Sequence, residues 1–387
     1  MIITVLPTGS YHGWGVCGKY LVRELSEKKK VLLIPESLNP NESNDIYDYQ
    51  LLLSKTAPPD ILAAIAAGNP LRFAAPILQP LDNDTWLPAL PHVSGSFNLG
   101  YTFFENNAIS PAAVHNASRS FDLVAAGSSW CEEILRRSGV PRTATLLQGI
   151  DPSLFHPYRR EKEYFKDRFV IFSGGKFELR KGQDLVVRAV KTLQQRHADV
   201  LLVCSWYNAW PDSLATMHQS PYIHFDPPSG DFTSLMNHLL TANGMDSSRT
   251  IVLPRMPNMM LSRVYKNSDI GLFPNRCEGG TNLVLMEYMA CGKPAVAAFN
   301  SGHRDILTAE NSIRILQSRP VAVEQTAAGP VIWDDPNLEE IIHHLEWAYH
   351  HRDALAGIGD RGARDLSQLT WTHTANRLLE LLPNDIV

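Results

Sequence analysis

Three features are scarce in this sequence: surplus charge of one sign, paired cysteines and long apolar runs. The net charge is −5, so the basic surplus typical of nucleic-acid binders is missing and we expect no nucleic-acid partner. The five cysteines are odd in number and show no C-x-x-C spacing, which predicts reduced thiols in a cytoplasmic protein. The longest clean apolar run, Ile61 to Ala67, is too short to span a bilayer, and nothing indicates peripheral membrane contact. The start of the chain shows no basic segment or cleavage site of a signal peptide.

The length and the alternation of segments predict two α/β domains. A chain of 387 residues exceeds what one core normally organises. Strand-like and helix-like segments alternate in both halves, which is typical of doubly wound parallel sheets. Residues 156–168 are polar and charged, as expected of a linker. We assign no regular structure to residues 206–248, and we expect two amphipathic helices in residues 337–386 with a break at Gly357 to Gly362.

The most informative stretch runs from Arg276 to Pro294. It reads as a buried strand at 269–273, a glycine loop at 278–282, a helix at 283–290 and a further strand at 295–299. Either Thr281 or Asn282 can cap the helix. In an open parallel sheet this unit points a helix N-terminus and free backbone N–H groups at the carboxyl edge, where anions bind.

Two carboxylates, Glu278 and Glu287, frame this loop. A carboxylate repels phosphate, so each is better used to accept hydrogen bonds from hydroxyl groups. One glutamate on a ribose and one on a second polyol would make a nucleotide-sugar site. The residues alone agree equally well with two ordinary surface acids at the ends of a βαβ turn.

The segment EGGTNLVLMEYMACGKPAVA, which begins at Glu278, resembles the signature of family-4 type retaining glycosyltransferases of the GT-B architecture, E-G-x-G-L-x-x-x-E-A-M-A-x-G-x-P-V. The resemblance implies that Glu278 contacts the transferred sugar and that Glu287 binds the ribose. It also implies that the loop amides hold the phosphates; the residues concerned are Gly279, Gly280, Thr281, Asn282 and Leu283. This chain has eight residues between the glutamates, one more than the family, which leaves the reach of Glu278 open.

Two lysines, Lys176 and Lys181, lie in a glycine-rich loop after a predicted strand. The family has G-R-x-x-x-x-K-G there, with both cations on the diphosphate. Lysine neutralises a phosphate as a point charge but lacks the fork of arginine, and Arg180 is an alternative contact. Two lysines and a helix N-terminus would stabilise a departing diphosphate without a metal. The alternative is a solvated basic loop.

A rival motif for metal binding is Asp82-Asn-Asp84, a D-x-D of the type that other glycosyltransferases use to hold a divalent cation. It lies in turn composition, Pro80-Leu-Asp-Asn-Asp-Thr-Trp. We interpret it as a turn and expect no metal site.

The first half carries weaker signals. Gly13, Gly15 and Gly18 loosely match a dinucleotide fingerprint, and the family has a glycine-rich loop at this point that faces the donor. A flexible first turn agrees almost equally well. Glu105 follows a predicted strand in a Gly-Tyr-x-x-x-Glu segment that family members share, which implies a place in the acceptor cleft; the alternative is a solvated loop acid.

The resemblance implies a GT-B fold, two Rossmann-like doubly wound domains facing each other across a cleft. Residues 1–160 would form the acceptor side and residues 161–369 the donor side, with a last helix in 370–387 packed back on the first domain. The implied reaction is metal-independent transfer, with retention, of a sugar from a UDP- or GDP-linked donor to a glycan, lipid-linked or protein acceptor. No cofactor would be tightly bound. The alternatives are an epimerase or phosphorylase on the same fold, and a catalytically silent sugar-nucleotide-binding protein.

Overall fold

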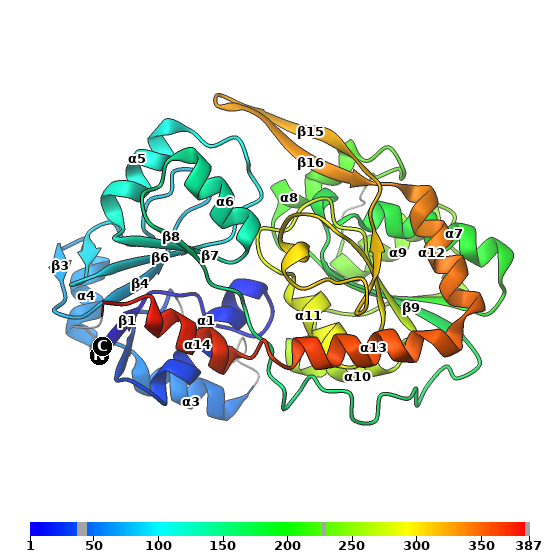
Figure 1. Ribbon diagram of the computed structural model, residues 1–387, viewed down its shortest axis with the longest axis horizontal. Helices are drawn as coiled ribbons and strands as arrows, with labels where there is room; N and C mark the ends of the chain where they lie inside the picture. Colours follow the sequence, from blue (N-terminus) through cyan, green and yellow to red (C-terminus); the bar gives the residue numbers. More distant parts are fainter. Residues whose placement is uncertain (37–44, 227–229, 384–387) are drawn as a thin grey trace. The chain divides into compact units, whose positions relative to one another are not determined.

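The computed structural model describes residues 1–36, 45–226 and 230–383 (Figure 1). The chain divides into two compact units, which are described separately. The first contains Met1–Gly149, Glu324–Val331 and Leu369–Val387, and the second contains Ile150–Val323 and Ile332–Gln368.

The first unit is built on a parallel sheet of six strands in the order β2-β1-β4-β6-β7-β8. The strands are β1 (Ile2–Thr4), β2 (Val31–Leu33), β4 (Ile77–Pro80), β6 (Asn98–Thr102), β7 (Leu123–Ala126) and β8 (Thr143–Thr145). The helices are α1 (Gly13–Ser26), α3 (Ile46–Lys55), α4 (Pro59–Ala66), α5 (Pro111–Ser120), α6 (Ser129–Ser138) and α14 (Trp371–Glu380). Two short strands, β3 (Leu71–Arg72) and β5 (Val93–Ser94), form a separate pair.

The second unit repeats the plan with the order β11-β10-β9-β12-β13-β14, again all parallel. The strands are β9 (Phe169–Lys176), β10 (Val200–Tyr207), β11 (Thr250–Val252), β12 (Ile270–Phe273), β13 (Ala295–Ala298) and β14 (Ile313–Ile315). The helices are α7 (Gln183–Arg196), α8 (Pro211–Ala215), α9 (Phe232–Ala242), α10 (Leu261–Lys266), α11 (Leu283–Ala290), α12 (Leu338–His350) and α13 (Arg352–Leu366). The connection direction reverses between β9 and β12, and open α/β sheets bind ligands at such a point.

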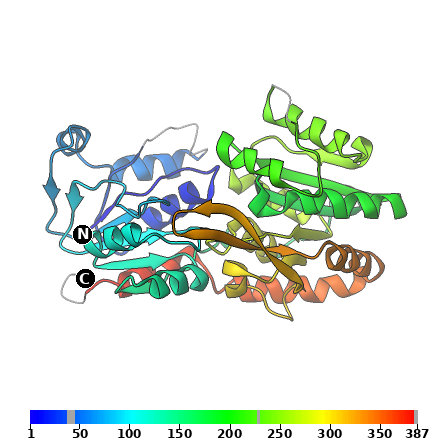
Figure 2. The ribbon, with the colours of Figure 1, turned by 90° about the horizontal axis from the view of Figure 1, so that it is seen from above.

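Both faces of the second sheet are buried, as its parallel strands require. Phe169 and Ile171 of β9 belong to a core cluster that also takes in α7, α9 and α12. Phe172, on the opposite face of the same strand, stacks on Tyr288 of α11 with ring centroids 5.3 Å apart and contacts Tyr265 of α10 at 5.1 Å. Figure 2 shows α7 on one side of this sheet and α13 on the other.

The predicted break at Gly357 to Gly362 is wrong, because α13 runs through these residues and the chain turns at His351 and again after Leu366. Gly359 permits close packing rather than a bend. A Cβ at Gly359 would lie 2.2 Å from the carbonyl oxygen of Gly292, just after α11. A glycine within a helical pattern can therefore indicate a close contact with a neighbouring segment as well as the end of the helix.

Two regions are more regular than predicted. The helix α9 lies inside the stretch 206–248, with Asp231 capping its N-terminus through hydrogen bonds from Thr233 and Ser234. A two-stranded ribbon, β15 (Ser318–Thr326) and β16 (Gly329–Pro336), precedes α12 and had no counterpart in the predicted elements.

The last helix, α14, packs on the first unit. Trp371 stacks on Tyr20 of α1 with ring centroids 5.4 Å apart, and Thr372 donates a 2.7 Å hydrogen bond to Glu24. Residues 384–387, which the predicted helical segment included, lie outside the described residues.

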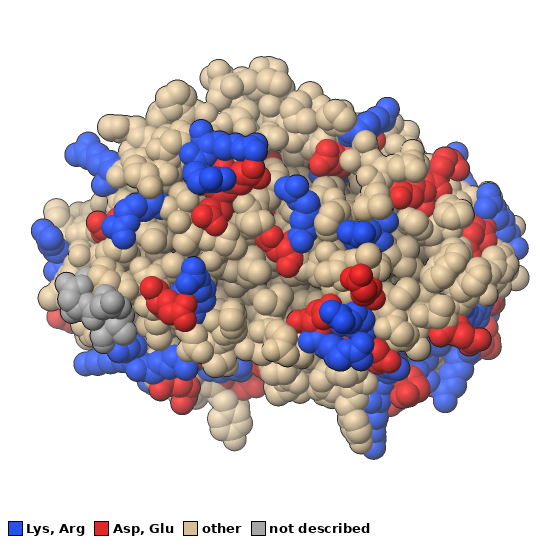
Figure 3. Space-filling model, in the orientation of Figure 1, with Lys and Arg blue, Asp and Glu red and all other residues tan. Residues whose placement is uncertain are grey.

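Within the described residues, no helix is both long enough and apolar enough to cross a bilayer. On the face shown in Figure 3, basic and acidic side chains are intermixed. This pattern agrees with the small net charge of the sequence.

Candidate active site

The candidate site of the second unit lies at the carboxyl ends of β9 and β12, where the strand order reverses. Lys176 is the last residue of β9, so it ends the strand and does not lie in the loop that the sequence predicts. A short 3-10 turn (η1, Leu179–Lys181) follows and carries Arg180 and Lys181. The loop 274–282 leaves β12 at the same edge and leads into α11, whose bounds agree with the prediction.

The loop before α11 is fixed by close backbone contacts. Gly302 donates its N–H to the carbonyl oxygen of Glu278 at 3.0 Å, and a Cβ there would lie 1.8 Å from the carbonyl oxygen of Gly280. The N–H of Glu278 is in turn bonded to Ser301 Oγ at 2.8 Å. The turn at residues 300–305 (η5, Ser301–Asp305) therefore holds the glycine loop in place through these hydrogen bonds.

Asn282 occupies the N-cap position of α11 with φ 64°, but in the described part of the chain its side chain makes no cap hydrogen bond. Thr281 does not cap the helix either, since its hydroxyl donates to Met286 Sδ at 2.9 Å. The expectation that one of them caps the helix through its side chain is wrong. The first N–H groups of α11 are thus not taken by these side chains, which suits an anion site.

The imidazole of His303 forms a hydrogen bond with the side chain of Asn282. Its Nδ1 donates to the carbonyl oxygen of Ala298 at 2.9 Å, so Nε2 is free of hydrogen and accepts from Asn282 Nδ2 at 3.1 Å. Burial lowers the pKa of His303 to about 4, with Glu278 opposing and Lys181 adding to the effect. The neutral imidazole is therefore a structural part of the loop.

Glu278 is buried among cations. Lys181 Nζ lies 2.5 Å and Arg180 Nη1 lies 3.1 Å from Glu278 Oε1, and Asn275 Nδ2 donates to the same oxygen. Burial raises the pKa of Glu278, but Lys181 and Arg180 outweigh this and hold it at about 2. Burial likewise lowers the pKa of Lys181, and Glu278 counteracts that effect. The two predicted residues Lys181 and Glu278 are thus direct partners.

A second buried carboxylate, Glu178, lies among the same cations. The sequence analysis did not identify it. It lies 2.9 Å from Lys176 Nζ and 2.6 Å from Arg180 Nη2. Burial raises the pKa of Glu178, but Arg180 and Lys176 hold it below its usual value. The ammonium of Lys176 also lies 5.1 Å from the ring of Trp210. We call Lys176, Glu178, Arg180, Lys181 and Glu278 the cation cluster.

Arg276 joins the two loops of the site from inside the protein. Its guanidinium forms two 2.8 Å bonds to Asp184 of α7 and a third to Asp335, and it donates to the carbonyl oxygen of Leu179 at 2.6 Å. All three charged side chains are buried. The loop after β12 is therefore tied to the turn that carries Lys181. No signal in the sequence separates Arg276 from an ordinary loop arginine.

Glu287 lies on α11 and is also buried. Asn258 Nδ2 donates to its Oε1 at 3.1 Å, and the Tyr265 hydroxyl donates to its Oε2 at 3.3 Å. A carboxylate only accepts hydrogen bonds, and these two bonds fix its orientation.

Comparison with known proteins supports a glycosyltransferase architecture. Residues 168–328 match the family model described as glycosyl transferases group 1. Among solved structures, sucrose-phosphate synthase from Thermosynechococcus elongatus superposes with a TM-score of 0.67 at 13% identity, covering 98% of both chains. The Anabaena protein HepE in complex with UDP-glucose gives a TM-score of 0.63 at 15% identity over 98% of both chains. The fold is GT-B.

Curated relatives cover less of the chain. A GDP-mannose-dependent α-(1-6)-phosphatidylinositol monomannoside mannosyltransferase from Mycolicibacterium smegmatis is 23% identical over 61% of this chain and 55% of its own length. A D-inositol 3-phosphate glycosyltransferase 1 from Catenulispora acidiphila is 29% identical over 42% of this chain and 36% of its own length. The chain thus spans about half or less of the length of these relatives. The match to the group 1 family model supports the expected resemblance to glycosyltransferases, whereas the family-4 type and the retaining mechanism stay predictions.

In the first GT-B domain the structure places Gly13 and Gly15 in the first turn of α1, not in the loop that the sequence predicts. His12 caps this helix, its Nδ1 accepting from the N–H of Gly15 at 3.1 Å. The ring of Trp14 packs on Phe103 with centroids 4.6 Å apart, so the start of α1 adjoins the segment that leads to the half-buried Glu105. These residues share the carboxyl edge of the first sheet, and their roles stay predictions.

Asp82 closes a turn in the same GT-B domain. Its carboxylate accepts from the backbone N–H groups of Asp84, Thr85 and Leu87 at 3.0, 2.6 and 3.1 Å. Burial raises the pKa of Asp82, but the hydrogen bonds from Thr85 outweigh this and lower it. Its lone pairs are largely used within the turn. The absence of a metal requirement stays a prediction.

Proposed function

We propose that the protein is a glycosyltransferase of the retaining type that moves a sugar from a nucleoside-diphosphate sugar to an acceptor hydroxyl. The observation that carries this proposal is the cation cluster beside the N-terminus of α11, at the switch point of the second sheet. The relatives and neighbours support a nucleotide-sugar donor, since one is named GDP-mannose-dependent and another was solved with UDP-glucose. The donor we propose is UDP- or GDP-linked.

The diphosphate would lie against Lys176, Lys181 and the first N–H groups of α11. Three cations and two carboxylates leave the cluster with one net positive charge, and the helix terminus adds about half a charge. The loop residues whose amides would face the phosphates are Gly279, Gly280, Thr281, Asn282 and Leu283. Charge that develops on the diphosphate in the transition state is stabilised by such fixed cations and dipoles, so we propose that no divalent metal is needed.

The two glutamates would divide the rest of the donor. Glu287, oriented by Asn258 and Tyr265, accepts hydrogen bonds from the ribose hydroxyls. Glu278 is the carboxylate that contacts the transferred sugar. In the proposed reaction the bond between the anomeric carbon and the diphosphate oxygen breaks, and the acceptor oxygen bonds to the same face. The acceptor proton passes to the departing diphosphate.

The acceptor would bind in the first domain, where Gly13, Gly15 and Glu105 share one sheet edge. A glycan, a lipid-linked sugar or a protein hydroxyl are the classes we propose. The five cysteines, all among the described residues, are buried and form no disulfide, which favours a reducing compartment, and we propose the cytoplasm.

The first experiment incubates the protein with UDP- and GDP-sugars, with and without a panel of acceptors, and measures released nucleoside diphosphate and new glycoside. Glycoside formed only with an acceptor supports the proposal. A new nucleotide sugar without acceptor would indicate an epimerase, and phosphate-dependent sugar phosphate a phosphorylase. Binding of a nucleotide sugar without any turnover would indicate a catalytically silent sugar-nucleotide-binding protein.

The metal requirement is tested separately. Turnover abolished by EDTA and restored by Mg²⁺ or Mn²⁺ would overturn the metal-independent mechanism. Loss of activity in an Asp82→Ala/Asp84→Ala variant would then identify that pair as the metal ligands.

The second experiment separates the two glutamates by titration calorimetry. Glu287→Gln should weaken the nucleoside diphosphate and the full donor alike by about tenfold or more, because a hydrogen bond to a charged acceptor contributes about 1.5–3 kcal/mol. Glu278→Gln should not weaken nucleoside diphosphate binding, while it lowers kcat and sugar discrimination. The exposed Glu310→Gln is the matched control. The reverse pattern would refute this assignment of roles.

A further inference from the structure

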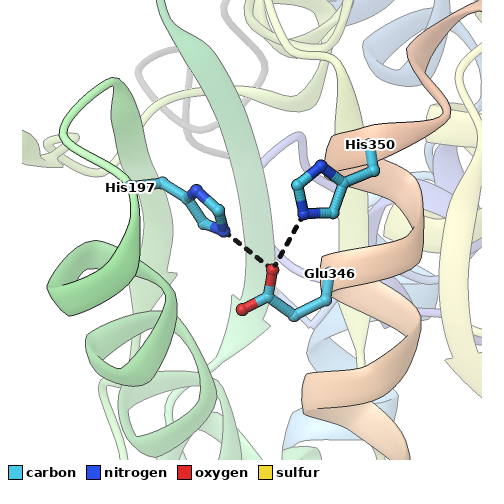
Figure 4. A group of neighbouring side chains, drawn as sticks. All are labelled: His197, Glu346 and His350. Atoms are coloured by element: carbon cyan, nitrogen blue, oxygen red, sulfur yellow. Dashed lines mark hydrogen bonds and ion pairs between the residues drawn. The ribbon is translucent and has the colours of Figure 1, made fainter.

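A second group of polar side chains lies in the second unit at the ends of α7 and α12. His197 is the C-cap residue of α7, and Glu346 and His350 are one turn apart on α12. Figure 4 shows both imidazoles directed at the carboxylate of Glu346. His197 Nε2 lies 2.7 Å and His350 Nε2 lies 3.7 Å from Glu346 Oε2. Two helices distant in sequence thus present two nitrogens and one oxygen to a common point.

The spacing of these atoms suits a small tetrahedral ion. All three ligand atoms lie within 4.8 Å of one another. Zinc-to-ligand distances of about 2.0–2.1 Å in tetrahedral geometry place neighbouring ligand atoms about 3.3 Å apart. The two measured separations, 2.7 and 3.7 Å, bracket that value, so small side-chain rotations are enough to admit the ion.

Surrounding groups hold two of the three side chains in place. The ring of His197 stacks on Tyr349 with centroids 3.8 Å apart, and the Tyr349 hydroxyl donates to Asp199 at 2.7 Å. Arg196 donates to Glu346 Oε1 at 2.8 Å, which leaves Oε2 directed at the histidines. Carboxylates that bind metals are commonly held by such an outer hydrogen bond.

We propose that His197 Nε2, Glu346 Oε2 and His350 Nε2 form a binding site for a divalent transition-metal ion, with Zn²⁺ as the best match. Two imidazoles and one carboxylate are ligands that zinc accepts, with a water completing the tetrahedron. Ca²⁺ and Mg²⁺ prefer oxygen ligands only and are excluded by the two nitrogens. The bound ion would tie the end of α7 to α12.

The position of the site assigns it a structural role. His197 precedes β10, which starts at Val200 and ends at Tyr207, the residue paired with Lys176 of the cation cluster. Seven residue steps of a strand cover roughly 23 Å, so the site is at the opposite edge of the sheet from the candidate active site. The ion should raise the stability of the second unit and leave donor turnover unchanged.

The test uses the full chain without a histidine tag, stripped of metal by a chelator. Zn²⁺ is titrated by calorimetry, and thermal unfolding is followed with and without Zn²⁺. One ion should bind per chain, and Tm should rise with Zn²⁺ and fall again with excess EDTA, because a ligand of the folded state stabilises it by mass action. His350→Ala should weaken Zn²⁺ binding at least about tenfold and abolish the rise in Tm. The His350 side chain is 61% exposed, so this variant should fold normally.

His343→Ala provides the matched control, since His343 is exposed on the same helix and lies outside the group. It should bind Zn²⁺ like the unaltered chain. Three results would overturn the proposal: no Zn²⁺ binding, equal binding in His350→Ala, or equal weakening in both variants, which would mean dispersed surface histidines. Whether the chain turns over a nucleotide sugar at all is an independent question, and its answer bears on the candidate active site alone.

Discussion

The buried His303 should make the stability of the protein depend on pH in a defined window. Its pKa is about 4 in the folded state, against 6.5 for an unperturbed histidine. Between these values the unfolded chain binds the proton and the folded chain does not, so the free energy of unfolding decreases as pH falls from about 6.5 to 4. One pKa unit corresponds to about 1.4 kcal/mol, so the full loss is about 3 kcal/mol.

The physical cause is visible in the hydrogen bonds of the ring. Nδ1 already donates to Ala298 and Nε2 accepts from Asn282, so a proton on Nε2 would face a donor. Glu278, whose pKa is about 2, loses its stabilising contribution only below about pH 4.5, and the two windows therefore barely overlap.

Urea unfolding at half-unit steps from pH 7 to 4.5, on the unaltered chain and on His303→Gln, measures this effect. The variant should be less stable at pH 7, because it loses one of the two hydrogen bonds. It should also have a flatter profile, so that the difference between the two proteins shrinks as pH falls. Titration of the other histidines is common to both proteins and cancels in the difference. Parallel profiles across this range would refute the assignment of a buried neutral imidazole.

The remaining predictions concern the loops of the donor site. Lys176→Ala or Lys181→Ala should weaken binding of the free nucleoside diphosphate and lower kcat, since in the proposed site both charges would face the leaving group; unchanged affinity in both variants would contradict the assignment. Arg276→Met should cost about 3–5 kcal/mol in urea unfolding, because Asp184 stays buried without its cation and Asp335 keeps only the exposed Arg319, whereas Arg319→Ala should cost less than about 1 kcal/mol. Gly302→Ala should displace the glycine loop, since its Cβ would overlap the carbonyl oxygen of Gly280, and donor affinity should fall further than Tm.

The elements that sequence reasoning located best are those whose signals are local. The helix Leu283–Ala290 has the predicted bounds. It follows a glycine loop and ends at Gly292 and Pro294, and a run of good helix formers between such signals leaves little freedom in its bounds.

The missed elements depend on distant contacts or on signals that were underweighted. The helix α9 has apolar residues at helical spacing, Phe232, Leu235, Met236 and Leu239, after a capping aspartate, so its signal was present. The glycines of α13 were interpreted as a break because the close partner of Gly359, the backbone of Gly292, is about 67 residues earlier in the chain. A neighbour at that distance cannot be inferred from local propensity.

The same distinction applies to the site. Motif spacing indicated Lys176, Lys181, Glu278 and Glu287, but not the pairs that they form. The Lys181–Glu278 contact joins residues 97 positions apart, and the Arg276–Asp184 contact joins residues 92 positions apart. The sequence could therefore supply the charged residues of the site, whereas their mutual neutralisation is visible only in the folded chain.

This neutralisation gives the Lys181–Glu278 pair a specific part in the proposed reaction. A diphosphate is more negative than a carboxylate, so its arrival draws Lys181 and Arg180 toward the phosphate oxygens and weakens their hold on Glu278. A buried carboxylate that loses its cations needs other hydrogen-bond donors, because an unpaired buried charge is costly. The hydroxyl groups of the transferred sugar are donors that arrive with the same ligand. A nucleoside diphosphate without the sugar supplies none, so the proposed site should bind the complete donor more tightly than the free diphosphate, and Glu278→Gln should reduce that difference.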